Sequence, residues 1–136
     1  MAKKVLVVDD VAFVRKTLSE ILREAGYEVI AEAADGREAI SKWQEHRPDL
    51  ITMDVVMPNL GGIEATREII KQDKRATIVM ISAMDQIHLV MEAIHVGAKD
   101  YIQKPFLASD VLHVLSRALR GESTPDAPSS LSPRAS

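Results

Sequence analysis

Five short apolar runs alternate with five amphipathic stretches along this chain, and this alternation restricts its possible folds more than any other feature. We expect the apolar runs to be β-strands at about residues 4–9, 28–33, 49–54, 77–82 and 99–102. The first, third and fourth runs are almost continuously apolar, which is typical of a parallel sheet covered by helices on both faces. Five strand–helix units with short connections therefore predict a doubly wound α/β fold.

The stretches between the runs carry apolar residues three or four positions apart, as one face of an amphipathic helix does. Gly26 and Gly97 follow two of these stripes and predict helix ends. Asp35 and Glu38 have the spacing of a capping box that opens a helix, and Ser109 is a candidate cap for the last helix. The expected buried faces are Val14, Leu18, Ile21, Leu22 and Ala25; Ala39, Ile40 and Trp43; Ile63, Thr66, Ile69 and Ile70; Ile87, Val90, Met91 and Ile94; and Val111, Leu115, Ala118 and Leu119.

The length and composition favour one folded domain followed by a tail. The chain has 136 residues, of which 46% are hydrophobic, and this is enough for a single core. From Gly121 onward, Leu131 is the only large apolar residue among many serines and prolines. We therefore expect a domain at residues 1–120 and a disordered tail at residues 121–136, either native or the stub of a linker.

The charge and cysteine content argue against several classes of protein. The net charge is −3, which does not indicate binding to nucleic acid or to an anionic membrane. The chain has no cysteine, which fits a reducing cytoplasm and excludes disulfides. The run after Lys3 and Lys4 is too short for a signal peptide, and no run approaches the roughly 18 apolar residues of a membrane span. We expect a monomeric cytoplasmic protein that binds neither nucleic acid nor membrane.

Acidic residues stand at the ends of two expected strands. Asp9 and Asp10 follow the first apolar run, and Asp54 ends the third. Because the carboxyl ends of parallel strands meet at one edge of a sheet, we expect these three carboxylates to lie together there. Mg²⁺ prefers oxygen ligands, and a cation would relieve the repulsion among the carboxylates. The three residues predict a magnesium site to which a backbone carbonyl just after Asp54 could contribute, although Asp9 and Asp10 alone would equally suit a helix-capping turn.

Two other polar residues stand at or just after the ends of the fourth and fifth expected strands. Ser82 ends the fourth apolar run, and Lys104 follows the fifth and precedes Pro105. Taken alone, Ser82 would be read as a turn residue and Lys104 as an ordinary exposed lysine. Beside Asp54, however, the lysine can pair with the carboxylate and both side chains can donate to phosphoryl oxygens. The combination predicts a site that accepts a phosphoryl group next to a divalent cation.

Taken together, in this order and at this spacing, the motifs resemble the receiver domains of two-component response regulators. The resemblance covers about residues 3–120 and implies a flavodoxin-like sheet of five parallel strands, in the order 2-1-3-4-5, flanked by five helices. Phe13–Arg15 and Ser82–Gln86 are similar to stand-alone chemotaxis response regulators in particular. The motifs that carry the family resemblance are Val5–Asp10, Asp54–Gly62, Ser82–Ala83, Gly97–Tyr101 and Lys104–Phe106.

The resemblance implies roles for the residues of the predicted site. Asp54 is expected to be the phosphoacceptor, Lys104 to contact the phosphoryl group, and Ser82 to be a hydroxyl switch coupled to Tyr101. The implied cofactor is Mg²⁺, and the Lys104–Pro105 peptide bond is expected to be cis. The implied magnesium ligands are Asp10, Asp54 and the backbone carbonyl of Val56, with Asp9 acting mostly through water.

The resemblance also implies an output surface. Phosphorylation is expected to change the face formed by the fourth helix, the fifth strand and the fifth helix. The residues expected on this face are His88, Glu92, His95, Lys99, Tyr101 and His113.

The implied function is signal transduction rather than enzyme catalysis, with self-phosphorylation and autodephosphorylation as the only chemistry. Expected partners are a sensor histidine kinase as phosphodonor, an output protein such as a flagellar motor switch component, and a phosphatase. A phosphate sink and the excised receiver of a transcriptional regulator are alternatives.

Two other classes of protein are less consistent with the motifs. A magnesium-dependent phosphatase with an aspartyl nucleophile usually carries a second acid two residues after the nucleophile, where this chain has Val56. A flavin-binding protein would need a phosphate loop after the first strand, where this chain has two carboxylates. A metal site from His88 and His95 lacks a partner ligand at a suitable spacing.

Overall fold

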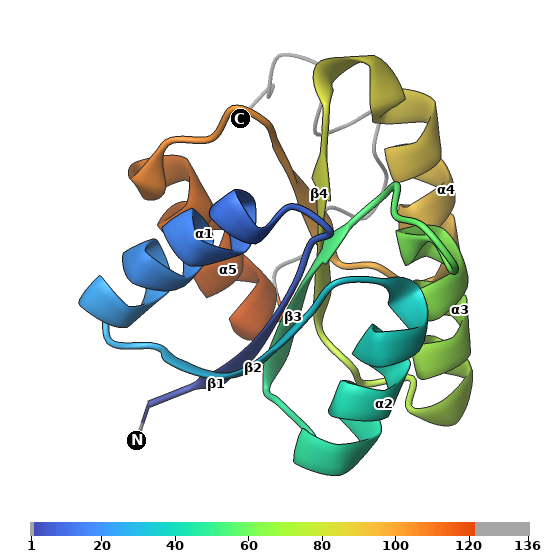
Figure 1. Ribbon diagram of the computed structural model, residues 1–136, viewed down its shortest axis with the longest axis horizontal. Coiled ribbons are helices and arrows are strands. Elements are labelled where there is room, and N and C mark those ends of the chain that lie inside the picture. The colour runs from blue at the N-terminus through green and yellow to red at the C-terminus, as the bar shows by residue number, and fades with distance from the viewer. Residues whose placement is uncertain (1, 122–136) are drawn as a thin grey trace.

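Five parallel strands form a single sheet with helices on both faces in the computed structural model, which describes residues 2–121 (Figure 1). The strand order is β2-β1-β3-β4-β5, which confirms the doubly wound fold and the order implied by the family resemblance. The strands are β1 (Lys4–Val8), β2 (Glu28–Ala33), β3 (Leu50–Asp54), β4 (Ile78–Ser82) and β5 (Asp100–Gln103). Apart from Gly121, the tail predicted for residues 121–136 lies outside the described residues.

Two helical layers cover the sheet. The helices are α1 (Ala12–Glu24), α2 (Gly36–His46), α3 (Gly62–Gln72), α4 (Ile87–Val96) and α5 (Ala108–Leu119), and a 3₁₀ turn (Met84–Gln86) precedes α4. Figure 1 shows α1 and α5 on one face of the sheet and α2, α3 and α4 on the other. None of the helices within residues 2–121 is long and apolar enough to cross a membrane.

The two cores, one on each face of the sheet, explain why β1, β3 and β4 are mostly apolar. Successive side chains of a strand point to opposite faces, so Val5 and Val7 pack with α1 and α5 while Leu6 and Val8 pack on the other side. All residues of β3 and β4 are buried for the same reason. Most positions of these strands are therefore used in packing, and two polar residues, Asp54 and Ser82, stand at the carboxyl ends of β3 and β4.

Most of the predicted helix ends are confirmed. Gly26 and Gly97 follow α1 and α4 with φ of +95° and +131°, a backbone conformation that favours glycine. Asp35 caps α2, since its carboxylate accepts a hydrogen bond from the Glu38 N–H at 2.9 Å. The second half of the predicted capping box differs, because the Glu38 carboxylate bonds to the N–H of Ala34.

Three details of the predicted helices are wrong. Ser109 does not cap α5, because the Val111 N–H bonds to the Leu107 carbonyl and places Ser109 inside the first turn. Met91 is 38% exposed, because its neighbour Val90 takes the core-facing position of α4. Ala25 is exposed because α1 ends one residue before it, at Glu24.

Candidate functional site

The three predicted carboxylates meet at the carboxyl edge of the sheet. Val8 of β1 pairs with Met53 of β3, so the residues that follow them, Asp9 and Asp54, emerge beside one another. One carboxylate oxygen from each of Asp9, Asp10 and Asp54 lies within 4.8 Å of the others. Asp9 and Asp54 are buried, whereas Asp10 is exposed. The position of the acids at strand ends therefore produces a cluster in which two carboxylates are buried and the third is open to solvent.

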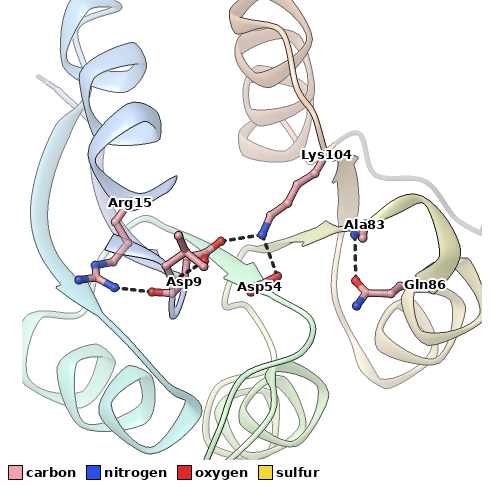
Figure 2. Close-up of polar contacts among 7 residues, drawn as sticks. Asp9, Arg15, Asp54, Ala83, Gln86 and Lys104 are labelled. Carbon is pink, nitrogen blue, oxygen red and sulfur yellow. Dashed lines mark hydrogen bonds and ion pairs between the residues drawn. The ribbon is translucent and has the colours of Figure 1, made fainter. Parts of the chain in front are cut away.

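Lys104, the first residue after β5, reaches this cluster. The Lys104 N–H donates to the Ser82 carbonyl at 2.7 Å, which fixes the start of the β5–α5 loop beside β4. The Lys104 Nζ lies 3.0 Å from Asp9 Oδ2 and 3.4 Å from Asp54 Oδ1 (Figure 2). The Lys104–Pro105 bond is cis, as expected from the family resemblance. One ammonium group is thus shared between two buried carboxylates.

The clustering of charge changes the acid–base properties of the site. Burial, followed by the negative charge of Asp9, raises the pKa of Asp54 to about 7, even though Lys104 opposes this shift. Burial lowers the pKa of Lys104, but the carboxylates of Asp9 and Asp54 outweigh this and raise it above its ordinary value. One ammonium group therefore does not fully compensate the negative charge of the cluster.

The oxygen atoms of the cluster fit a hard divalent cation. Asp9 Oδ2 is buried and accepts no hydrogen bond from the described residues, although the Lys104 ammonium lies 3.0 Å away as an ion-pair partner. A set of carboxylates open to water on one side suits Mg²⁺, which binds through one or two carboxylates and keeps several waters. The residues that could hold the ion are Asp9, Asp10, Asp54 and the carbonyl of Val56.

Magnesium is expected to stabilise this fold, because it would relieve the repulsion among Asp9, Asp10 and Asp54. At a concentration about 100 times its dissociation constant, the ion should add about 2.7 kcal/mol to the free energy of unfolding. Denaturant or thermal unfolding with and without magnesium measures this difference. The Asp10→Ala variant should lose most of it, whereas Asp110→Ala on α5 should keep it. Equal stabilisation of the Asp10→Ala variant would place the ion elsewhere.

The remaining predicted site residues lie around the acidic cluster. Ser82 ends β4 and is buried. The turn after it is closed by two hydrogen bonds between Ala83 and Gln86, one from the Ala83 N–H to the Gln86 side chain at 2.8 Å (Figure 2). Val56 and Met84 are 52% and 74% exposed. The residues two positions after Asp54 and after Ser82 are thus apolar and open to solvent.

Tyr101 lies on β5, the edge strand of the sheet. Its side chain is half-buried and packs against the core on the α4 side. Beside it, a groove of about 460 Å³ runs along β5 and α5, with Met84, Lys104, Asp110, His113 and Arg117 among its lining residues. The groove extends from Lys104 to the face that carries Tyr101.

The residues expected on the output surface come from α4, from β5 and the residue before it, and from α5, and His88, Glu92 and His95 share one face of α4 by their spacing. His88, His95 and His113 are exposed, and Lys99 is partly exposed. Glu92 is also exposed, but its carboxylate lies 3.7 Å from Arg67 of α3. Glu92 therefore contacts α3 as well as lying on the expected output surface. Among residues 2–121, the group of three possible metal ligands that the structure brings together is Asp9, Asp10 and Asp54, and it contains no histidine.

Two contacts near the cluster were not expected from the sequence. Arg15 donates to the backbone carbonyl of Asp9 at 2.6 Å, and Asn59 donates to the Asp35 carboxylate at 2.8 Å. In the sequence, Arg15 stands out only as part of a motif similar to that of chemotaxis response regulators. Its position one turn into α1 is the one signal that could have indicated a contact with the preceding loop. For Asn59, the neighbouring Pro58 and Gly61 indicated only a loop.

Comparisons with known proteins agree with this geometry. A model of the response regulator receiver domain family matches residues 5–116. The chemotaxis protein CheY of Thermotoga maritima is 51% identical over 117 residues, which are 86% of this chain and 98% of that protein. CheY of Bacillus subtilis is 49% identical over 119 residues, 88% of this chain and 99% of that protein.

A solved structure adds a comparison of the fold. A chain from the CheX–CheY–BeF₃–Mg²⁺ complex of Borrelia burgdorferi superposes with a TM-score of 0.78 at 39% identity, covering 82% of this chain and 84% of that chain. The family match, the CheY relatives and the sheet order are mutually consistent. This chain belongs to the response regulator receiver domain family and is close to CheY within it.

Proposed function

We propose that this chain accepts a phosphoryl group on Asp54 from a sensor histidine kinase and signals through its α4–β5–α5 face. The observation that carries the proposal is the position of Asp54, which lies at a sheet edge beside two further carboxylates and Lys104. In this proposal the receiver domain comprises residues 1–120 and acts as a monomer in the cytoplasm.

The proposed chemistry is a transfer between a phosphohistidine and an aspartate. An oxygen of the Asp54 carboxylate attacks phosphorus, the P–N bond breaks, and the histidine nitrogen keeps the electron pair of that bond. The ammonium of Lys104 leaves its ion pair with Asp54 and holds a phosphoryl oxygen. Magnesium would supply positive charge that offsets the charge on the phosphoryl oxygens and lowers the repulsion toward the carboxylate.

Asp54 is favoured as an acceptor rather than as the nucleophile of a phosphatase. Rapid hydrolysis of an aspartyl phosphate requires a group that activates water, and the residue two positions after Asp54 is the apolar Val56. Both Val56 and Met84 are exposed beside the cluster and neither can act as a base. The site is therefore suited to hold a phosphoryl group, with autodephosphorylation as a slower side reaction.

The proposed switch links the phosphoryl group to β5. The Ser82 hydroxyl donates to a phosphoryl oxygen and draws the β4–α4 turn toward Asp54. Tyr101, which is half-buried beside the groove along β5, then moves inward and changes the surface of α4 and α5. A partner that binds the two states equally would transmit nothing, so the change in this face must alter its affinity for the output protein.

The proposed setting is chemotaxis, because the CheY relatives are named chemotaxis proteins. The output partner would be a flagellar motor switch component. A phosphatase is a further proposed partner, and the Borrelia structure is described as a complex of CheY with CheX. Alternatively, the chain would act as a phosphate sink if phosphorylation left its α4–β5–α5 face unchanged.

Amide chemical shifts recorded with magnesium and beryllofluoride, a stable mimic of the phosphoryl group, test this proposal. Shifts are expected both in the loops around Asp10, Asp54 and Lys104 and across residues 88–101, because the switch joins the two regions. The Asp54→Asn variant serves as the control and should show neither set of changes. Changes confined to the loops would contradict the switch and favour the phosphate sink.

A further inference from the structure

We propose that the short segment from the end of β2 to the start of α2, residues 32–36, holds both loops of the acidic cluster, so that Arg15 and Asn59 act as positioning residues for magnesium binding. The inference rests on the magnesium site of the proposed function. The first loop, residues 9–11, carries two of the carboxylates. The second, residues 55–61, carries the carbonyl of Val56.

The first loop is tied to the end of β2 through Asp9. The Asp9 N–H donates to the Ala33 carbonyl at 3.0 Å. The Asp9 carbonyl accepts a hydrogen bond from Arg15 Nη1 at 2.6 Å (Figure 2). Arg15 is itself held by Glu32, because its Nε donates to Glu32 Oε1 at 3.1 Å. The backbone N–H of Asp9 is therefore held directly by β2, and its backbone carbonyl is held through Arg15, which is bonded to Glu32 of β2.

An arginine suits this position for a geometric reason. The rigid guanidinium presents Nη1 to one acceptor and Nε to another, which the single ammonium of a lysine cannot reproduce. The Arg15 side chain is 20% exposed and that of Glu32 is 39% exposed. The pair is thus partly open to water, and its effect is expected on the orientation of Asp9 more than on the stability of the fold.

The second loop is tied to the start of α2. Asn59 Nδ2 donates to Asp35 Oδ2 at 2.8 Å, and the Gly36 N–H donates to the Leu60 carbonyl at 2.8 Å. A Cβ atom on Gly36 would lie 2.5 Å from the Leu60 oxygen, so this approach requires glycine. Asn59 has a φ of +67°, a conformation that asparagine tolerates better than most residues.

Asp35 is itself rigidly placed. Its second carboxylate oxygen accepts the Glu38 N–H at the start of α2, and hydrogen bonds from Glu38 and Asn59 lower its pKa. The same short turn therefore fastens Asp9 on one side and the loop that carries Val56 on the other. Because metal affinity depends on the groups that orient the ligands, we expect loss of either attachment to weaken magnesium binding.

Calorimetric titration of the full chain with magnesium tests the first attachment. Arg15→Met removes the donors and keeps an apolar side chain in α1, and Arg23→Met is the matched control on an exposed position of the same helix. The dissociation constant should rise about tenfold for Arg15→Met and stay unchanged for Arg23→Met. A purely structural role predicts a lower melting temperature in chelator with an unchanged dissociation constant, and this result would overturn the proposal.

A double-mutant cycle tests the second attachment. Asn59→Gly keeps the positive φ and removes the amide, while Asp35→Ser keeps an oxygen that can cap α2 but loses the second acceptor. Each change should raise the dissociation constant for magnesium several-fold. The double variant should have a dissociation constant no higher than that of the single variant that binds less tightly. Wild-type affinity in Asn59→Gly, or additive effects of the two changes, would contradict the inference.

Binding of magnesium by the wild-type chain separates the magnesium site from the positioning role of Arg15 and Asn59. A wild-type chain that does not bind magnesium would overturn the magnesium site and this inference with it. A wild-type chain that binds the ion, together with Arg15 and Asn59 variants that bind it equally well, would overturn the positioning role alone.

Discussion

The Asp54→Asn variant is expected to take up no phosphoryl group from acetyl phosphate, whereas the wild-type chain takes up one. Asparagine keeps the shape of the side chain but has no anionic oxygen to attack phosphorus. Transfer to the unsubstituted chain breaks the P–O bond of the donor and releases acetate. Phosphate-affinity electrophoresis, run with magnesium present, separates the two forms and measures the fraction modified.

Asp110→Asn is the matched control, because Asp110 is an exposed carboxylate on α5 that can react only if the chemistry is unselective. It should be modified as fully as the wild-type chain. Equal modification of Asp54→Asn and the wild-type chain would show that the acceptor lies elsewhere. Omission of magnesium should slow the reaction of the wild-type chain, because the carboxylates then repel the donor.

The second large effect concerns pH and the metal-free fold. The free energy of unfolding should fall as pH rises from about 4 to about 7, since the pKa of Asp54 is raised to about 7 in the folded chain. In this window the folded state keeps a proton that the unfolded state has lost, and stability then decreases with pH. One pKa unit corresponds to about 1.4 kcal/mol, so the Asp54 contribution is limited to roughly 4 kcal/mol.

Urea unfolding in the presence of a chelator, repeated across this pH range, measures the effect. Asp54→Asn should lack this part of the pH dependence and should be more stable than the wild-type chain at neutral pH. Saturating magnesium should also reduce the slope for the wild-type chain, because the ion favours the charged carboxylate. Parallel pH profiles for the wild-type chain and Asp54→Asn would rule out a raised pKa for Asp54.

The fold was predictable because its strands leave a simple pattern. Strands β1, β3 and β4 are buried on both faces, so they appear as apolar runs that end abruptly at Asp9, Asp54 and Ser82. The rule that parallel strands share a carboxyl edge then brings these residues together without further information. The acidic cluster and Lys104 were predicted for this reason, and the structure places them within contact distance.

The details that escaped prediction depend on tertiary contacts. Met91 and Val90 are neighbours in an apolar helix, and only packing against the sheet decides which of them is buried. Ser109 is a good cap by residue type, but the helix already begins at Ala108. The contacts of Arg15 and Asn59 join segments from different parts of the chain, and no periodicity in the sequence marks such pairs.

The most direct test of the account is to locate the phosphoryl group on the wild-type chain. The protein is incubated with acetyl phosphate and magnesium, reduced with borohydride to trap the acyl phosphate, digested and mapped by mass spectrometry. We expect a single modified site at Asp54, dependent on magnesium. A modification mapped to any other residue, or no modification while the chain remains folded and magnesium-bound, would contradict the proposed role of Asp54.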